Sequence, residues 1–401
     1  MYFSLTPTLE NTLGKGQLRY VDRQQSNCYK WDSEQSVGTL PLWVADMDFA
    51  AAPCILRAMR ERLDHGVFGY NIVPDDYYKA VARWFERKHG WTGIVKENLI
   101  LTTALVPALS AILRAMQMRR GAGKEKPLHV LTLTPAYNCF FSSISNLDAE
   151  LVDCALKDED GSFEIDWEDF EDKLSRSEVL ILCNPHNPTG RIWSREELLR
   201  IARLCDEKNV FVISDEIHCE IVRSGRQYVP YATVAERKEN YCVMTSASKA
   251  FNIAGLQCAN VFVPDAANHA LIDRAVNVHE VGELNPFGMV ATIAAYNEGE
   301  AWLRELNEYV DGNFLWLESF LQDNLPEFGL TKPEATYLAW VRLPEGVVAE
   351  EFCSRLRDEQ HVLLNPSEIY GAKGYVRVNL ATSREVLEEA MRRLLRFVRN
   401  G

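Results

Sequence analysis

The chain has 401 residues, of which 47% are apolar and 10% aromatic, so it can bury a large core and is long enough for two domains. Its formal net charge of -14 argues against nucleic acid or an anionic membrane as a main partner, because both require a basic face. No apolar run approaches the roughly 18 residues of a membrane span, and the first residues lack a basic and apolar leader pattern. We therefore expect a cytoplasmic protein that binds neither nucleic acid nor membrane.

Short β-rich runs alternate with helix-like stretches from about residue 98 onwards. The first run, "NLILTT" (98–103), precedes a segment with apolar residues at helical spacing and basic residues in its last turn. Further β-rich runs are "LHVLTLTP", "VLILCNP", "VFVISDE" and "YCVMTSAS", which end at residues 135, 185, 216 and 248. This alternation predicts an α/β fold whose large, mostly parallel sheet is sandwiched by helices.

The pattern changes near Pro286. Long helical patterns (300–325) are followed by the strand-like runs "ATYLAWVRL" and "YVRVNLAT" and by a helical pattern at 384–400. We expect these residues to form a smaller α+β domain together with the start of the chain. The predicted division is a large ligand-binding domain at 51–287 and a small domain made of 1–50 and 288–401.

The ten cysteines are scattered, and the sequence contains no C-x-x-C pair. Several of them lie inside apolar strand-like runs, where a reduced thiol behaves as a small hydrophobic side chain. The sequence therefore indicates neither a disulfide framework nor a metal site.

Polar and small residues follow the predicted strands, and ligands of open parallel sheets bind beyond the carboxyl ends of the strands. A helix start at Ala104 and Leu105 offers free backbone amides to an anion. The residues that follow the later runs are Tyr137, Asn187, Asp215, Ser246, Ser248 and Lys249. Few ligands require all of these groups at once.

Pyridoxal 5'-phosphate (PLP) does require them. Its aldehyde needs a lysine for a Schiff base, and its ring nitrogen needs a carboxylate that keeps it protonated; Lys249 and Asp215 fit these two needs. Asn187 is expected to donate to the 3'-oxygen, and Tyr137 to stack on the ring. Ser246 and Ser248, with the amides of Ala104 and Leu105, are the candidate phosphate ligands. Lys249, Asp215 and Tyr137 are the predicted catalytic residues.

Each of these residues also has an ordinary structural explanation. Asp215 could cap a helix, the 184–190 segment could be a plain turn, and the serines could be turn formers. Tyr137 could be a core aromatic, and Arg377 could be an exposed strand residue. For His218 we favour a hydrogen-bonded residue that lines the site and moves no proton. These explanations are independent, whereas one cofactor accounts for the whole set.

The motifs also resemble a known family, the fold-type I PLP enzymes of the aminotransferase class I/II group. The matching stretches are "NPHNPTG", "SDEIH", "SASKAFNIAGLQ" and "YVRVNLAT", and the resemblance extends from near Leu40 to the C-terminus. Within the group, "LPLWVADMDF", "HGVFGY" and "NPHNP" followed by "GRIW" look most like cystathionine β-lyases of the MalY and PatB type.

The resemblance implies the same roles for Lys249, Asp215, Asn187, Tyr137, Ser246 and Ser248 as those given above. It adds His218 to the cofactor site and Arg377 as the residue that binds the substrate α-carboxylate, a task suited to a bidentate guanidinium. It matches Tyr70 to a tyrosine that reaches the phosphate of a neighbouring subunit, which implies a homodimer with shared sites.

Two positions depart from the family pattern. Gln257 stands where many aminotransferases have a phosphate-binding arginine, and Ala104 stands where relatives often have glycine. The first departure removes one charge partner of the phosphate, and the second affects only how closely the backbone approaches it.

A PLP ring that accepts electrons from the substrate Cα allows two reactions of a bound amino acid. With a thiolate leaving group on Cβ, elimination gives a thiol, pyruvate and ammonia; without one, the same site performs transamination. Residue patterns do not choose between them, and the resemblance favours a carbon–sulfur β-lyase acting on cystathionine or a related sulfur amino acid. An aminotransferase is the first alternative, and a PLP-binding regulatory protein that acts through a protein partner is the second.

Overall fold

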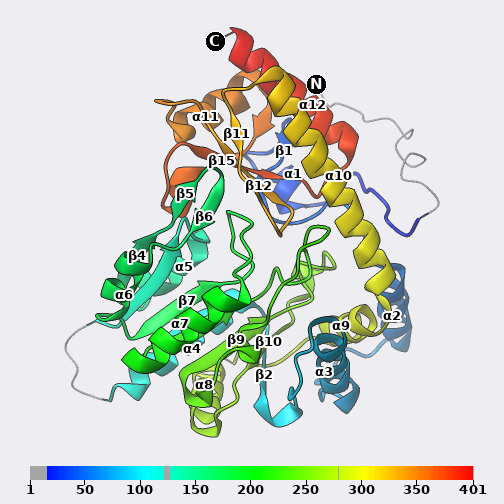
Figure 1. Cartoon of the computed structure of the whole chain (residues 1–401). Helices are drawn as coiled ribbons and strands as arrows, with labels where there is room; N and C mark the ends of the chain where they lie inside the picture. The colour runs from blue at the N-terminus through cyan, green and yellow to red at the C-terminus, as the bar shows by residue number, and fades with distance from the viewer. Residues whose placement is uncertain (1–15, 122–126, 279, 401) are drawn as a thin grey trace.

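The computed structural model describes residues 16–121, 127–278 and 280–400 (Figure 1). Its larger sheet has seven strands in the order β2-β10-β9-β8-β7-β3-β4. Strand β10 is antiparallel to both neighbours, and the other neighbouring pairs are parallel. The strands are β2 (Leu99–Thr102), β3 (His129–Thr134), β4 (Glu150–Ala155), β7 (Val179–Cys183), β8 (Phe211–Asp215), β9 (Tyr241–Thr245) and β10 (Ala259–Phe262). The predicted mostly parallel sheet is confirmed.

Helices cover both faces of this sheet. Successive residues of a strand point to opposite sides, and both sets are apolar, so both faces must be covered. In β7, Val179 and Ile181 pack into one hydrophobic cluster while Leu180 and Leu182 pack into the other. The first cluster includes residues of α4 (Leu105–Arg119), α5 (Asn138–Ser145) and α8 (Ala266–Asn277). The second includes residues of α2 (Pro53–His65), α3 (Asp75–His89), α6 (Trp167–Leu174), α7 (Arg195–Lys208) and α9 (Pro286–Glu298).

The ends of two helices differ in a way that bears on the site. Helix α7 begins with a capping box, in which the Ser194 side chain accepts from the Glu197 amide and Glu197 accepts from the Ser194 amide. Helix α4 begins at Leu105 after Ala104, whose side chain makes no cap hydrogen bond. The first-turn amides of α4 are therefore left without a side-chain acceptor.

The second sheet has four antiparallel strands in the order β11-β12-β15-β14. These strands are β11 (Gly329–Leu330), β12 (Leu338–Arg342), β14 (Asn365–Pro366) and β15 (Tyr375–Asn379). Figure 1 shows the long helix α10 (Glu300–Asn324) running from the second sheet towards α2 and α9. The remaining elements are α1 (Tyr29–Asp32), α11 (Ala349–Gln360), α12 (Arg384–Asn400), the parallel pair β1 (Leu40–Pro41) with β13 (Val362–Leu363), and the hairpin β5 (Lys157–Glu159) with β6 (Ser162–Glu164).

The N-terminal segment reaches across the molecule to these C-terminal elements. Strand β1 pairs with β13, and the Asn379 amide at the end of β15 donates to the carbonyl of Leu42. A small domain built from both ends of the chain, with boundaries at residues 50 and 287, remains a proposal. Within the described residues, no helix is both long and apolar enough to cross a bilayer. The cytoplasmic location remains a prediction from the sequence.

Candidate active site

A cavity of about 510 Å³ lies where the carboxyl ends of the parallel strands meet the second sheet. Every predicted site residue except Tyr70 lines it. The predicted residues that it brings together are Ala104, Leu105, Tyr137, Asn187, Asp215, His218, Ser246, Ser248, Lys249 and Arg377. Lys249 and Asp215, which the sequence places on successive strand ends, therefore face one space.

Lys249 follows β9, and its Nζ donates a hydrogen bond to the carbonyl oxygen of Ala45 at 2.6 Å. Desolvation in the cavity lowers the pKa of this amine from its ordinary value to about 8, although the negative charge of Asp46 opposes that shift. A substantial fraction of the amine is therefore neutral near pH 8, and a neutral amine can act as a nucleophile or a base.

Asp215 is the last residue of β8 and is buried. Its Oδ1 accepts from the backbone amide of Ile217 at 3.2 Å, and burial raises the pKa of the carboxyl group to about 6. The charge of Lys249 opposes this rise, and a further cation in contact with the carboxylate would lower the cost of burying it. A protonated pyridine nitrogen is such a cation.

His218 is buried in the wall of the same cavity, and its Nδ1 has no hydrogen-bond partner among the described residues. Burial lowers its pKa to about 3, so the imidazole is neutral at physiological pH. The expected hydrogen bond of this side chain is therefore not seen at Nδ1. With this ring neutral, the positive charges at the cavity are those of Lys249 and Arg377.

Arg377, in the middle of β15, is buried and points into the cavity from the second sheet. Its Nη1 donates to Oδ1 of Asn187 at 3.2 Å and its Nη2 donates to the carbonyl of Trp43 at 2.8 Å. Its guanidinium carbon lies 4.7 Å from the centre of the Tyr370 ring, and its Nε has no partner among the described residues. The guanidinium is thus fixed in place at the cavity wall, and a guanidinium there suits an anionic ligand such as a carboxylate.

The start of α4 and the β9 turn form the candidate phosphate end of the cavity. Ala104 and Leu105 line it, and the uncapped amides of α4 favour an anion. Ser246 Oγ already donates to the carbonyl of Cys258 at 2.7 Å and accepts from the amide of Ser248 at 3.0 Å. Ser246 must therefore rotate its hydroxyl before it can donate to a phosphate.

Tyr137 precedes α5 and borders the cavity, with its ring edge-on to Phe140 at 5.7 Å between centroids. Burial raises the pKa of its hydroxyl above the ordinary value, so Tyr137 is neutral. The position allows contact with a flat ligand in the cavity, and stacking on a cofactor ring remains a prediction.

Two residues lie outside the cavity of their own chain. Tyr70, between α2 and α3, is fully exposed. Gln257, the position where many aminotransferases have an arginine, is also exposed and takes a left-handed backbone conformation with φ of 50°. The expected role of Tyr70 requires a second subunit.

Several cavity residues were not foreseen from the sequence. Trp43, Val44 and Ala45 form one wall, and Asn365 and Tyr370 extend it beside Arg377. None of them follows a strand of the larger sheet. The expectation that ligands bind beyond the carboxyl ends of parallel strands, which located the other residues, therefore could not predict them. The alternation of β15 placed Arg377 on one face but did not reveal what that face contacts.

The donor set of the cavity fits PLP. It combines a lysine amine of lowered pKa, a buried carboxylate of raised pKa, and an uncapped helix start. These groups match the aldehyde, the ring nitrogen and the phosphate. Asn187 lies at the same wall with its Oδ1 bound to Arg377, which leaves its amide group to donate.

Comparisons with known proteins place the chain in a family. Residues 39–394 match the family of class I and II aminotransferases. Cystathionine beta-lyase PatB of Bacillus subtilis is 37% identical over 384 residues, which cover 93% of this chain and 97% of PatB. The chain belongs to the class I and II aminotransferase family.

Two solved structures share the fold over nearly the whole chain. A PLP-bound protein of Clostridium difficile 630, provisionally named an aminotransferase, has a TM-score of 0.89 and 36% identity, covering 94% of this chain and 98% of its own. The PLP-bound C-S lyase of Staphylococcus hominis has a TM-score of 0.85 and 33% identity, covering 94% and 97%.

The lowered pKa of Lys249 predicts how this amine reacts. Only the neutral amine is acylated, so acetylation of Lys249 in the PLP-free protein should rise with pH around a midpoint near 8. Competitive labelling with trace acetic anhydride, with each lysine quantified by peptide mass spectrometry, measures the midpoint. The exposed Lys332, labelled in the same sample, is the internal reference. A Lys249 midpoint equal to that of Lys332 would contradict the assigned desolvation.

Proposed function

We propose that the protein is a PLP-dependent carbon–sulfur β-lyase that releases a thiol, pyruvate and ammonia from a sulfur amino acid. The observation that carries this proposal is the convergence of Lys249, Asp215 and Arg377 on one cavity. The similarity to PatB and to the Staphylococcus hominis C-S lyase supports elimination as the outcome.

Each residue of the cavity has a defined task towards the cofactor. Lys249 would hold its aldehyde, Asp215 would pair with its ring nitrogen, and Asn187 would donate to its 3'-oxygen. The α4 amides after Ala104, with Ser248, would bind its phosphate. When bound, PLP supplies a positively charged ring that accepts electrons from the substrate Cα.

Arg377 and Lys249 act on the substrate itself. The fixed guanidinium binds the α-carboxylate and thereby orients the Cα–H bond. The free amine of Lys249 takes the Cα proton at Nζ, which its lowered pKa permits at near-neutral pH. The electron pair left at Cα then forms a Cα–Cβ double bond while the Cβ–S bond breaks, and the sulfur leaves with the bonding electron pair as a thiolate. Water hydrolyses the released enamine to pyruvate and ammonia. The neutral ring of His218 adds no competing positive charge.

A direct assay separates this activity from transamination. The wild-type protein should form pyruvate from L-cystathionine or S-methyl-L-cysteine without added 2-oxo acid, and Lys249→Ala should reduce the rate by roughly a thousandfold or more. Lactate dehydrogenase coupling measures pyruvate, and Lys332→Ala, which removes an exposed lysine, is the matched control.

Two results would contradict the assignment. Consumption of a 2-oxo acid with no pyruvate from any sulfur amino acid would make the protein an aminotransferase. An absence of turnover with both kinds of substrate, in a protein that holds PLP, would favour the regulatory alternative.

The homodimer is part of the same proposal. Between the end of α2 and the start of α3 the chain exposes a cluster of apolar side chains that a second copy could cover. These are Leu63, Val67, Phe68, Tyr70 and Ile72. In such a dimer Tyr70 would reach the phosphate end of the partner's cavity, and each site would need both chains.

Shared sites predict complementation between inactive variants. Tyr70→Ala and Lys249→Ala homodimers should each have low activity. After unfolding and refolding as a mixture, they should regain about a quarter of wild-type activity, because half of the dimers are mixed and each contains one intact site. The pyruvate assay measures the recovery, and each variant refolded alone is the control. Activity of the mixture equal to the mean of the two variants would rule out sites that share Tyr70.

A further inference from the structure

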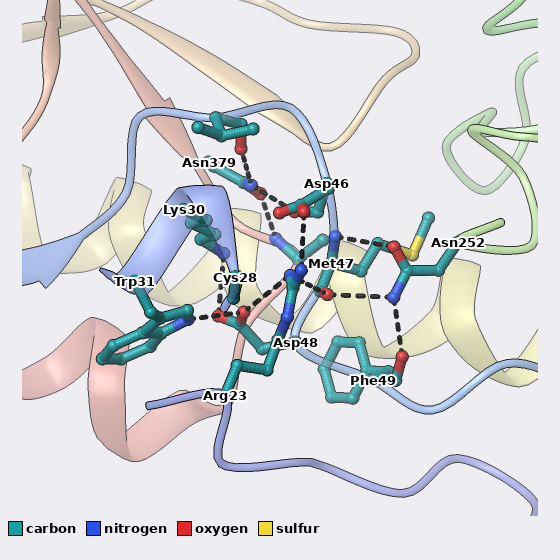
Figure 2. Close-up of polar contacts among 12 residues, drawn as sticks. Arg23, Cys28, Lys30, Trp31, Asp46, Met47, Asp48, Phe49, Asn252 and Asn379 are labelled. Atoms are coloured by element: carbon teal, nitrogen blue, oxygen red, sulfur yellow. Dashed lines mark hydrogen bonds and ion pairs between the residues drawn. The ribbon is translucent and has the colours of Figure 1, made fainter. Parts of the chain in front are cut away.

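Hydrogen bonds from β15 and from the turn that follows β9 hold the segment of residues 43–49, and Figure 2 shows the side chains of Asn379 and Asn252 on its two sides. Nδ2 of Asn379 donates to the carbonyls of Val44 and Asp46, each at 2.6 Å. On the other side, Nδ2 of Asn252 donates to the carbonyls of Met47 and Phe49 at 2.9 and 2.7 Å.

The centre of the segment is held by two donors on one oxygen. Tyr337 Oη donates to the carbonyl of Ala45 at 2.9 Å, and Lys249 Nζ donates to the same oxygen at 2.6 Å. The position of the ε-amine is therefore tied to a segment that has little freedom to shift. Asp46 is the next residue of that segment.

The carboxylate of Asp46 is anchored through one oxygen only. Its Oδ2 pairs with Arg23 Nη2 at 2.9 Å, whereas its Oδ1 is buried and has no hydrogen-bond partner among the described residues. Asp46 does not line the cavity, although Val44 and Ala45 do. The charge of Asp46 therefore acts on the cavity from outside it, across the residues that line it.

A second ion pair fixes the base of this arrangement. Asp48 accepts from the buried Lys30 at 2.8 Å and from Trp31 Nε1 at 2.9 Å. Arg23 donates to the carbonyl of Met47 at 2.9 Å, which ties its guanidinium to the backbone between the two aspartates. Figure 2 shows Arg23 positioned between Asp46 and Asp48. Asp46 is thus presented by a rigid scaffold rather than by a mobile loop.

We propose that Asp46 is a positioning residue for Lys249. The fixed negative charge of Asp46 stabilises the ammonium form of the Lys249 ε-amine, which lies at the Ala45 carbonyl. The inference rests on the proposed function, in which Lys249 takes a proton from the substrate. A proton that arrives at Nζ is then held next to a carboxylate outside the cavity, and no acid inside the cavity has to receive it. Asp46 supplies the charge and never touches the substrate.

Other charges around Lys249 are consistent with this role. Asp46 is the largest charge effect that raises the pKa of Lys249, ahead of Asp215, while burial and Arg377 lower it. The charged and titratable groups that face Lys249 or Asp46 from the surrounding elements are Arg23, Asp48, Tyr137, Cys139, Asp215, His218, Tyr337 and Arg377.

The test is the titration of Lys249 in variants of the PLP-free, full-length protein. Asp46→Asn keeps the backbone contacts of the segment and removes the charge, so the acetylation midpoint of Lys249 should fall by roughly one pH unit. Glu345→Gln removes one negative charge from an exposed turn and should leave the midpoint unchanged. Asp46→Glu restores the charge and should return the midpoint towards the wild-type value.

Arg23→Gln should shift the acetylation midpoint of Lys249 in the opposite direction. It removes the cation that partly neutralises Asp46, so the midpoint of Lys249 should rise. This variant also decides the matter if Asp46→Asn does not fold. An unchanged midpoint in a folded Asp46→Asn protein, or a fall in Arg23→Gln, would overturn the role of Asp46. The labelling requires neither PLP nor substrate. Its result is therefore independent of the pyruvate assay that tests the proposed lyase activity.

Discussion

The site depends on one constraint, which is that a lysine amine is desolvated in a cavity while its hydrogen bond and its neighbouring charges are fixed. The carbonyl of Ala45 holds Nζ at 2.6 Å, and burial lowers the pKa of the amine to about 8. An amine in water would be almost wholly protonated at neutral pH and would be a poor base. The surrounding fold serves to keep this amine dry, oriented and partly neutral.

Two sheets provide what that constraint requires. The larger sheet brings Asp215 and Lys249 to the ends of neighbouring strands, since β8 and β9 are parallel and paired. The second sheet supplies Arg377, and the 43–49 segment closes the space between them. The cavity is therefore lined by parts of the chain that lie far apart in the sequence.

The sequence predicted that the strand-end residues share one space, because parallel strands put their last residues at one edge of the sheet. Their roles towards a cofactor remain a prediction. The sequence did not predict the 43–49 wall, whose contacts with Asn252 and Asn379 join residues more than 200 or 300 positions apart along the chain. The antiparallel β10 also escaped prediction, since the short run at Ala259–Phe262 gives no sign of its direction. Asn365 and Tyr370 were missed because their partners, Trp43 and Arg377, are defined only by the packing of the second sheet.

The most direct test of the account is the site of attachment of PLP. Reduction of the PLP-loaded protein with borohydride, followed by peptide mass spectrometry, identifies the lysine that holds the cofactor. The account predicts one pyridoxyl group per chain, on the peptide that contains Lys249. Attachment to a different lysine, or no attachment in a protein that binds PLP, would contradict it.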